Sequence, residues 1–546
     1  MRHKTNKVIA AAALSAAMAF TLTACGGNSG AGGNGGGAKA SISGSQGAST
    51  ARAAKYLKDA GVSTPVTLNI EYNPDHYGSS SDQEYQDIKE QLEATGLFKV
   101  NLQSAEWVTY NAQRVKDAYP IYQMGWFPDY PDPDNYLSVF FGPNNFVNNH
   151  FSDAGIDQEI VAEQTDTNPT TRKTKIEQLQ NDLADKLSTL PLLQGKQEAV
   201  TGLDMTGVQD TLDASFQFRF AGMQKGGSAS NEINIGTTDK VTALDPAGSY
   251  DNGSYLLEYN VYPFVEGFKP GTPTPAGDIA TDCAFSTDGF QYTCHIKPGL
   301  KWANGDTLDA NDVKFSYDRD IKINNPDGPS SLLENIKSIT VPDNLTVVFN
   351  LKNANDVTFP QVLASPAGPI VDDQVFPADK LLSDDAIVKA NAFAGPYTID
   401  TYQVNNLVHF KANPSYQGLQ GLAKNAGVTL KTYAEESNMK LDIENNAIDV
   451  AYRSLSPTDT ASLQKNKKVK VLYGPGGEIR YLTFNMNTMP GNTPAQKLAV
   501  RQAIASSIDR DEISQSVYKG TYEPLCSYVP DGLLGANTAV CDKYNK

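Results

Sequence analysis

Strands and helices alternate near the start of this chain, and that alternation restricts the fold more than any other feature. The segment 66–72 alternates apolar and polar residues as a strand does, 82–94 has the spacing of an amphipathic helix, and 98–102 is again typical of a strand. A strand, a helix and a strand in succession indicate an α/β lobe. The chain has 546 residues, too many for one small core, so we expect two or three domains.

The composition fits a soluble globular protein. Hydrophobic residues make up 40% of the chain and charged residues 20%. The formal net charge is −17, and the isoelectric point is near 4.8. Because a nucleic-acid-binding protein is expected to carry a basic patch, this charge argues against nucleic acid as a partner. It supports solubility and does not identify a ligand.

The N-terminal segment has the features of a processing signal. Three basic residues come first, an apolar stretch follows at 8–22, and the sequence Leu-Thr-Ala-Cys ends at Cys25. This pattern predicts a lipoprotein signal peptide over 1–25, with the Cys25 thiol carrying the lipid; the alternative is an ordinary secretory signal with a chance cysteine. The Gly/Ser-rich run 26–50 is then a flexible tether. No later stretch is long and apolar enough to span a bilayer, so the lipid would hold the protein outside the membrane.

An even number of cysteines remains after Cys25, as expected in an oxidising compartment. They are Cys283, Cys294, Cys526 and Cys541. The first two lie symmetrically about Asp288-Gly289, a signal for a two-residue hairpin turn, so we predict a cross-strand disulfide between them. A strict two-residue turn would put them in the wider, hydrogen-bonded kind of pair. The last two would close a second loop; a metal site is the alternative, but no histidine lies near enough in sequence to support it.

Several longer motifs resemble one family. Residues 125–137 begin Gly-Trp-Phe-Pro-Asp, and residues 496–513 contain Val-Arg-Gln-Ala followed by Ile-Asp-Arg. Both resemble segments of the oligopeptide/dipeptide-binding family of extracytoplasmic solute-binding proteins of ABC importers, family 5. Further matches are the hairpin Ser-x-Asp-Gly, Lys-Pro-Gly-Leu-Lys-Trp at 297–302, a helix after the N-cap residue Asp309, Gly-Pro-Tyr at 395–397, and Asn-Pro-Ser-Tyr at 413–416.

The order of these motifs differs from that of the family. In the family the Val-Arg-Gln-Ala helix precedes the Trp…Asp loop, whereas here it follows the loop. The chain therefore resembles a circularly permuted member, in which the Gly-Gly-Ser stretch at 226–230 links the old termini. Permutation is physically reasonable when the old termini are close and the new break is an exposed loop. The alternative is that fragments were joined in the wrong order, and such a chain could fold poorly and bind nothing.

The resemblance implies a two-lobed α/β fold of the periplasmic-binding-protein type, with a hinge and an extra domain inserted in lobe 1. The expected parts are 231–275 and 396–480 as lobe 1, 205–225 as the return to lobe 1, 276–395 as the extra domain, 481–546 as the first part of lobe 2, and 51–204 as its second part. In this fold, ligand binding closes the lobes around the hinge.

The resemblance also implies the binding residues. Asp129 matches the family's partner for a ligand ammonium group, and Trp126 would form an aromatic wall. Trp107 and Arg114 match a pocket tryptophan and an arginine near the ligand carboxylate, and Tyr130 could border the pocket. The alternatives are an Asx-turn for Asp129, core packing for Trp126 and a solvated helix charge for Arg114. An arginine that dipeptide binders use is not evident in 68–72, which leaves the peptide length open.

These observations predict a lipid-anchored binding protein, a monomer, that captures peptides and delivers them to ABC permease subunits. It would lie on the outer face of the cell membrane or in the periplasmic space. We predict no enzyme, cofactor or metal: the five histidines form no metal-binding motif, and no nucleophile elbow or phosphate loop is present. The alternatives are an oligosaccharide or another small solute as ligand, which the tryptophans and tyrosines could stack on, and, third, a secreted hydrolase.

Overall fold

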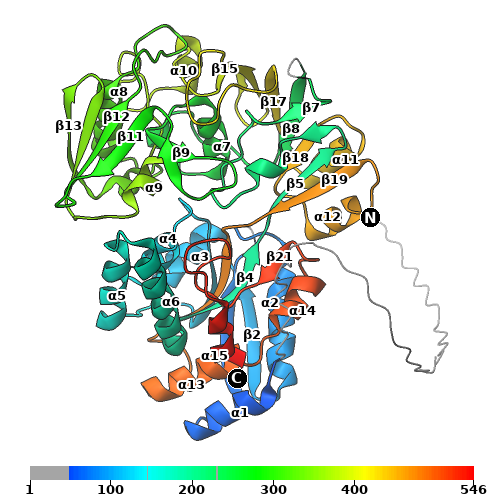
Figure 1. Cartoon of the computed structure of the whole chain (residues 1–546). Helices are drawn as coiled ribbons and strands as arrows, with labels where there is room; N and C mark the ends of the chain where they lie inside the picture. Colours follow the sequence, from blue (N-terminus) through cyan, green and yellow to red (C-terminus); the bar gives the residue numbers. More distant parts are fainter. Residues whose placement is uncertain (1–47, 75, 144, 229–230, 546) are drawn as a thin grey trace, which may run out of the picture. The chain divides into compact units, whose positions relative to one another are not determined.

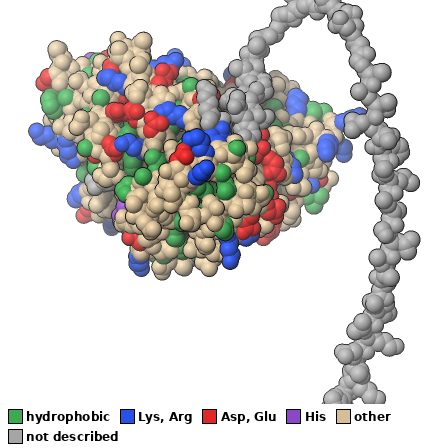
Figure 2. Space-filling view, turned by 90° about the horizontal axis from the view of Figure 1, so that it is seen from below, with side chains coloured by type: hydrophobic (Ala, Val, Ile, Leu, Met, Phe, Trp, Pro, Cys, Tyr) green, Lys and Arg blue, Asp and Glu red, His purple; other side chains and the backbone are tan. Residues whose placement is uncertain are grey.

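The computed structural model describes residues 48–74, 76–143, 145–228 and 231–545, which all belong to one unit (Figure 1). The predicted signal peptide, Cys25 and nearly all of the tether lie outside these residues. Among the described residues, no helix has the length and apolar character that crossing a membrane requires. On the face drawn in Figure 2, acidic and basic side chains are interspersed with apolar ones.

Lobe 2 is built on a six-stranded sheet in the order β2-β1-β3-β20-β4-β21. The predicted strand–helix–strand unit forms its edge, because β1 (Val66–Tyr72), α2 (Ser80–Ala94) and β2 (Phe98–Ser104) follow one another and the two strands pair in parallel. The other strands are β3 (Ile121–Trp126), β20 (Ile479–Phe484), β4 (Thr189–Gly195) and β21 (Tyr522–Pro524). Strand β20 runs antiparallel between β3 and β4, so the sheet combines strands from the two ends of the chain.

Helices cover this sheet and bury a single apolar core with it (Figure 1). They are α1 (Thr50–Asp59), α3 (Trp107–Arg114), α4 (Asp134–Phe141), α5 (Ala154–Gln164), α6 (Pro169–Lys186), α13 (Pro494–Ala505), α14 (Arg510–Ser516) and α15 (Cys541–Asn545). Helix α1 packs on α13, and the Ser49 amide donates to the Ser506 carbonyl at 2.7 Å. The second disulfide, Cys526–Cys541, ties α15 to the segment after β21 and joins the pair that the sequence predicts.

Lobe 1 contains a seven-stranded mixed sheet in the order β15-β16-β17-β8-β18-β5-β19. Its strands are β15 (Tyr397–Gln403), β16 (Leu407–Ala412), β17 (Gly427–Thr432), β8 (Glu232–Thr237), β18 (Val450–Tyr452), β5 (Gln197–Gly202) and β19 (Val469–Gly474). The helices of this lobe are α7 (Asn252–Val261), α10 (Asp384–Ala390), α11 (Glu436–Glu444) and α12 (Pro457–Leu463). Helix α10 lies in the range 276–395 predicted as the extra domain, but its Ile387 packs into the core of lobe 1. Two pairs of short strands add to it: β6 (Met205–Thr206) with β7 (Gln224–Lys225), and β9 (Glu266–Phe268) with β10 (Pro275–Gly277).

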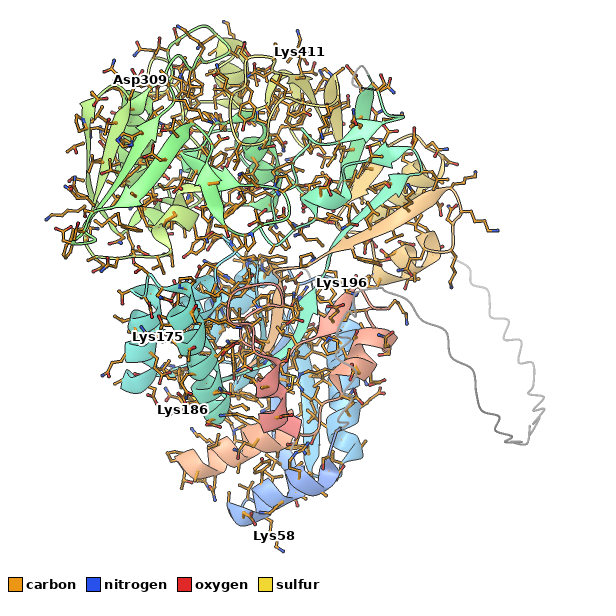
Figure 3. The ribbon with its side chains drawn as sticks, viewed as in Figure 1. Lys58, Lys175, Lys186, Lys196, Asp309 and Lys411 are labelled. Carbon is orange, nitrogen blue, oxygen red and sulfur yellow. A yellow bond between two sulfur atoms is a disulfide. The ribbon has the colours of Figure 1, made fainter. Side chains whose placement is uncertain are left out.

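The region predicted as an extra domain holds a separate antiparallel sheet in the order β11-β12-β14-β13 with its own apolar core. Its elements are β11 (Ala280–Phe285), β12 (Gln291–Ile296), α8 (Ala310–Ile323), β13 (Ile336–Asp343), β14 (Thr346–Leu351) and α9 (Phe359–Leu363). Asp309 caps α8 as predicted and forms a reciprocal capping box with Asp312; Figure 3 labels Asp309 at this helix.

The hairpin between β11 and β12 carries the first disulfide, Cys283–Cys294, with the predicted partners but a different turn. The Ser286 amide donates to the Gln291 carbonyl, and the Gly289 amide donates to the Ser286 carbonyl, so the loop spans 287–290 and is longer than a two-residue turn. The longer loop shifts the alternation of pairs by one. The two cysteines therefore lie in the close, non-hydrogen-bonded kind of pair, with their Cα atoms 4.1 Å apart.

Among the described residues, two strand-to-strand junctions connect the lobes: β4 to β5, and β19 to β20. They pass so closely that a Cβ atom on Gly476 would lie 1.4 Å from the Gly195 carbonyl oxygen. The Gly195 amide donates to the Glu478 carbonyl at 3.0 Å. Figure 3 labels Lys196 at the first junction. Strand β5, which follows Lys196, belongs to the sheet of lobe 1, although the predicted segment 51–204 assigned it to lobe 2. Nearly all residues of β4 and β5 are buried, so the sequence shows no exposed break at the boundary between the lobes.

Candidate functional site

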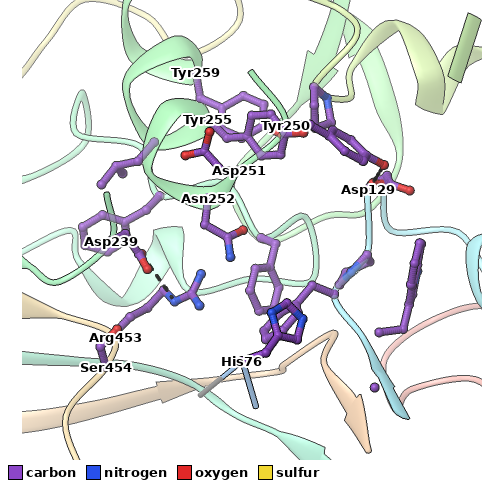
Figure 4. Close-up of a pocket in the computed structure, with 18 of the residues that line it drawn as sticks. His76, Asp129, Asp239, Tyr250, Asp251, Asn252, Tyr255, Tyr259, Arg453 and Ser454 are labelled. Carbon is purple, nitrogen blue, oxygen red and sulfur yellow. Dashed lines mark hydrogen bonds and ion pairs between the residues drawn. The ribbon is translucent and has the colours of Figure 1, made fainter. Parts of the chain in front are cut away.

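A cavity of about 530 Å³ lies between the two lobes and takes its walls from both (Figure 4). Lobe 2 contributes the end of β3 and the loop after it, and lobe 1 contributes the start of α7 and the end of β18. Aromatic side chains make up much of the wall: Tyr77, Trp107, Trp126, Phe127, Phe146, Phe216, Phe218, Tyr250, Tyr255, Tyr259 and Tyr452. Charged groups stand at a few fixed places, which is typical of a site that orients a small ligand.

Asp129 is the charged group that lobe 2 presents to this cavity. Its Oδ2 accepts a hydrogen bond from Asn135 Nδ2 at 3.1 Å, and its own amide donates to Asn135 Oδ1 at 2.9 Å. From the opposite lobe the Tyr250 hydroxyl donates to Asp129 Oδ1 (Figure 4). Burial raises the pKa of Asp129, although the hydrogen bonds that its carboxylate accepts from Tyr250 and Asn135 act in the opposite direction. No Lys, Arg or His of the described residues forms an ion pair with this carboxylate.

Both predicted tryptophans line the same cavity. Trp126 ends β3, donates from its indole Nε1 to Asn135 Oδ1 at 2.9 Å, and packs edge-on against Phe140. Trp107 begins α3 and stacks on the His76 ring with their centroids 3.8 Å apart. Asn135 therefore holds both Trp126 and Asp129, and the Gly-Trp-Phe-Pro-Asp motif is fixed as one unit by the first turn of α4.

The structure places Arg114 and Tyr130 outside the wall of the cavity. The buried Arg114 guanidinium donates to Asn111 Oδ1 and to the carbonyls of Phe146 and Val147, at 2.8 to 3.0 Å. It also lies over the Phe146 ring. The buried Tyr130 packs into the core of the extra domain. The five predicted binding residues thus divide into three that meet at the cavity and two that pack behind or beside it.

Comparison with known proteins identifies the family. A model of the bacterial extracellular solute-binding proteins, family 5 (middle region), matches residues 22–148 and 274–545. The chain belongs to family 5. Members of this family are binding proteins rather than enzymes, which removes the secreted hydrolase from the alternatives.

Curated relatives match a part of this family 5 protein. The chain is 27% identical over 318 residues to a probable D,D-dipeptide-binding periplasmic protein of Escherichia coli K12, covering 57% of this chain and 59% of that protein. It is 26% identical over 314 residues to the dipeptide-binding protein of the same organism, covering 54% and 56%. A glutathione-binding protein of Salmonella typhimurium is 25% identical over 313 residues, covering 57% and 58%. The chain thus spans less than two thirds of the length of these relatives.

Two solved structures of peptide-binding proteins each match less than half of the chain. An oligopeptide-binding protein from Bacillus subtilis in complex with a nonapeptide superimposes with a TM-score of 0.38 and 19% identity, covering 44% of this chain and 47% of that one. A dipeptide-binding protein from Pseudoalteromonas sp. SM9913 in complex with Met-Leu gives a TM-score of 0.37 and 17% identity, covering 43% and 50%.

The sequence prediction missed the cation that lobe 1 of this family 5 protein presents to the cavity. Arg453 follows β18, and its Nε lies 3.7 Å from Asp239 Oδ2 (Figure 4). Its guanidinium lies near the Phe127 and Phe216 rings. Arg453 and Ser454 both have φ of 60°, and Phe216 has 61°, in the left-handed region that such residues rarely adopt. Backbone of this kind gathers at functional sites, but the residue types give no sign of it.

A second chamber of about 430 Å³ adjoins the first. The two share the residues around Arg453: His76, Tyr77, Phe127, Phe216, Arg453 and Ser454. Its remaining wall is more polar and comes from the lobe junctions and from the starts of α2, α11 and α12. The candidate site therefore has an aromatic half containing Asp129 and a polar half beyond Arg453.

Proposed function

We propose that this protein captures peptides between its two lobes and delivers them to an ABC permease from the outer side of the membrane. One observation carries the proposal: Asp129 is a half-buried carboxylate in the wall of an aromatic cavity, and no cationic side chain of the described part pairs with it. A carboxylate withdrawn from water is stabilised when a positive charge meets it, and a peptide N-terminus supplies that charge.

The ligand ammonium group would take the place of the Tyr250 hydroxyl at Asp129 Oδ1. Tyr250 keeps 41% of its surface exposed, so it can turn aside without disturbing a core. The exchange replaces a neutral donor by a charged one, so the carboxylate gains an opposite charge as well as a hydrogen bond. Trp126 and the tyrosines of α7 would then enclose the first residues of the peptide.

The ligand carboxylate needs a cation, and Arg453 fits this role better than Arg114. The guanidinium of Arg453 faces the cavity and has one carboxylate partner, Asp239, at the long distance of 3.7 Å. The guanidinium of Arg114 is held by an amide oxygen and two backbone carbonyls. A peptide bound with its ammonium at Asp129 and its carboxylate toward Arg453 would bridge the lobes and favour their closed arrangement.

Calorimetric titration of the purified protein with free and N-acetylated tripeptides tests this function. We expect acetylation or Asp129→Asn to weaken binding by about 10- to 100-fold, because a hydrogen bond to a charged group contributes about 1.5–3 kcal/mol. The control variant Asp204→Asn removes a carboxylate on the exposed surface of lobe 1 and should leave affinity unchanged. Equal affinity for free and acetylated peptides would refute the role of Asp129, and no binding of any peptide would refute the function.

The lipid anchor on Cys25 belongs to this proposal and is supported by the Leu-Thr-Ala-Cys sequence alone. A lipid chain at that position, followed by a flexible tether, would keep the protein within reach of permease subunits. Cell fractionation of a Cys25→Ser variant would show the protein released from the membrane. A variant that stays with the membrane fraction would exclude the anchor.

We also infer that the chain order is a rearrangement of the family order. The reversed motifs support this, as does β20, which lies between β3 and β4 although it follows them by the whole of lobe 1. The packing of α1 on α13 is a further support, since it brings residues near 50 beside residues near 500. A reordered chain, 231–546 followed by 51–225, should melt cooperatively at a similar temperature and bind the same peptides. Failure of that chain to fold would refute the inference.

A further inference from the structure

The second chamber contains three cations, and each has its own carboxylate. Lys196 Nζ lies 2.9 Å from Glu523 Oε1, and Arg480 Nε lies 2.6 Å from Glu478 Oε1. Arg453, at the boundary with the first chamber, pairs with Asp239. The charges of Lys196 and Arg480 are therefore compensated at short distance within the protein, and only Arg453, whose partner lies 3.7 Å away, is left for a ligand carboxylate at the boundary.

Two carboxylates of the same wall have no such partner. Glu198 lies on β5, and Glu436 is the first residue of α11. Neither forms an ion pair with any Lys, Arg or His in the described part of the chain. The nearby Lys440 pairs instead with Asp459, with Nζ 3.0 Å from Oδ1. Both glutamates meet the first turn of α12: Thr460 Oγ1 donates to Glu198 Oε1 at 2.6 Å, and Asp459 repels the charge of Glu436. The uncompensated charge of the chamber is negative.

Arg480 gives a second, independent sign of a missing ligand group. Its side chain is only 4% exposed and lines the chamber. Nη2 donates to the Tyr77 carbonyl at 2.6 Å and to the Tyr522 hydroxyl at 3.1 Å, but Nη1 has no hydrogen-bond acceptor among the described residues. Buried donors are nearly always paired. Since the charge of Arg480 is already matched by Glu478, a neutral acceptor such as a peptide carbonyl oxygen would complete this group.

We propose that the second chamber binds a cationic side chain of the ligand, with its ammonium or guanidinium group between Glu198 and Glu436. Arg480 Nη1 donates to a carbonyl oxygen of the ligand backbone, whose terminal carboxylate lies toward Arg453. The substrate class is therefore peptides that carry lysine or arginine after the first residue. This inference rests on the proposed peptide-binding function and adds a selectivity that Asp129 cannot provide.

The burial of Glu198 agrees with this assignment. Burial raises the pKa of Glu198 to about 7, with the Thr460 hydrogen bond acting in the opposite direction. Burial likewise raises the pKa of Glu436, and the neighbouring Asp459 and Glu435 add to the effect. A cation that enters the chamber with the ligand would favour the ionised form of both carboxyl groups, as any nearby opposite charge does.

The test is a calorimetric titration of the purified protein with a positional series of tetra-alanine peptides. In each peptide one alanine is replaced by lysine, by norleucine or by glutamate. The norleucine side chain resembles that of lysine but lacks the charge. We expect lysine at one position to bind at least tenfold tighter than norleucine at that position. Glu198→Gln, alone and with Glu436→Gln, should abolish the lysine preference and leave the norleucine peptides within about threefold of their affinity for the parent protein. Retained norleucine binding also shows that the variants fold.

Glu435→Gln is the matched control, because it removes the same charge from the exposed residue directly before Glu436. It should keep the full lysine preference. If unsubstituted tetra-alanine binds but lysine and norleucine bind equally at every position, the proposed cation-binding role of the second chamber is refuted and the peptide-binding function stands. A preference for glutamate, or a lysine preference that survives in the double variant, also overturns the assignment. If no free peptide binds, the proposed function fails and this inference fails with it.

Discussion

Replacing Glu198 by glutamine should stabilise the empty protein above neutral pH and leave its stability nearly unchanged in acid. Burial raises the pKa of Glu198 to about 7 from an ordinary value of 4.5. Below pH 4.5 the carboxyl is protonated in both the folded and the unfolded chain, and its titration then costs no stability. Between pH 4.5 and 7 only the unfolded chain releases the proton, so the free energy of unfolding falls as the pH rises. Above pH 7 the loss is complete.

The size of this loss follows from the shift in pKa. A rise of the pKa from 4.5 to about 7 corresponds to about 3 kcal/mol, since a tenfold change in an equilibrium constant is worth about 1.36 kcal/mol. The side chain is only partly buried by its surface area, so solvent screening reduces the effect, and we expect about 1–3 kcal/mol. Glutamine has the same shape and no charge, and it can still accept the hydrogen bond from the Thr460 hydroxyl.

Thermal unfolding at a series of pH values between 4.5 and 8.5 measures the effect. The melting temperature of Glu198→Gln minus that of the parent should be near zero at pH 4.5 and should rise to several degrees at pH 8.5. Glu435→Gln should show no such rise, because that side chain is exposed. A constant difference across the whole range would show that Glu198 titrates normally, and the reasoning about the chamber would be wrong.

Two further predictions concern the framework that holds the chambers. Gly476→Ala should lower the melting temperature and weaken peptide binding, since its Cβ would lie 1.4 Å from the Gly195 carbonyl oxygen and would push the two lobe junctions apart; a variant that melts and binds like the parent would show that the junctions can separate freely. Arg319→Met should destabilise the protein by about 3–5 kcal/mol, because the buried Asp245 loses both guanidinium hydrogen bonds, at 2.8 and 2.6 Å. In denaturant titrations the double variant with Asp245→Asn should recover part of that loss; no recovery would show that packing, and not the unpaired charge, matters.

Local patterns predicted the parts of this fold that depend on local forces. The alternation in 66–72, the cap at Asp309 and the symmetric spacing of Cys283 and Cys294 all have their expected counterparts. The hairpin turn was predicted too short, because Asp288-Gly289 favours a two-residue turn while the hydrogen bonds of Ser286 close a longer loop. That error reversed the predicted kind of pair for the cysteines and did not change their partners.

Residues of the candidate site could be predicted only where neighbours in the same motif hold their side chains in place. Asp129 and Trp126 lie in one short motif that Asn135 fixes, so the resemblance of that motif to the family was enough to place both at the cavity. Arg114 has a suitable charge and a suitable spacing, but two backbone carbonyls that fold back from residues 146 and 147 withdraw it from the cavity. Arg453 depends on a left-handed backbone at a position without glycine, and tertiary structure alone produces that conformation.

The two roles of Glu198 lead to one more measurable consequence. In the empty protein near pH 6 this carboxyl holds a proton, because burial raises its pKa to about 7. A lysine ammonium in the chamber favours the ionised form, so binding must release that proton. Titrations at pH 6 in buffers of different ionisation enthalpy should therefore show proton release with the preferred lysine peptide and much less with its norleucine counterpart. At pH 8.5 the carboxyl is already ionised and the difference should vanish. Equal proton release for both peptides at pH 6 would show that the proton comes from another group. The raised pKa of Glu198 would then have no part in ligand recognition.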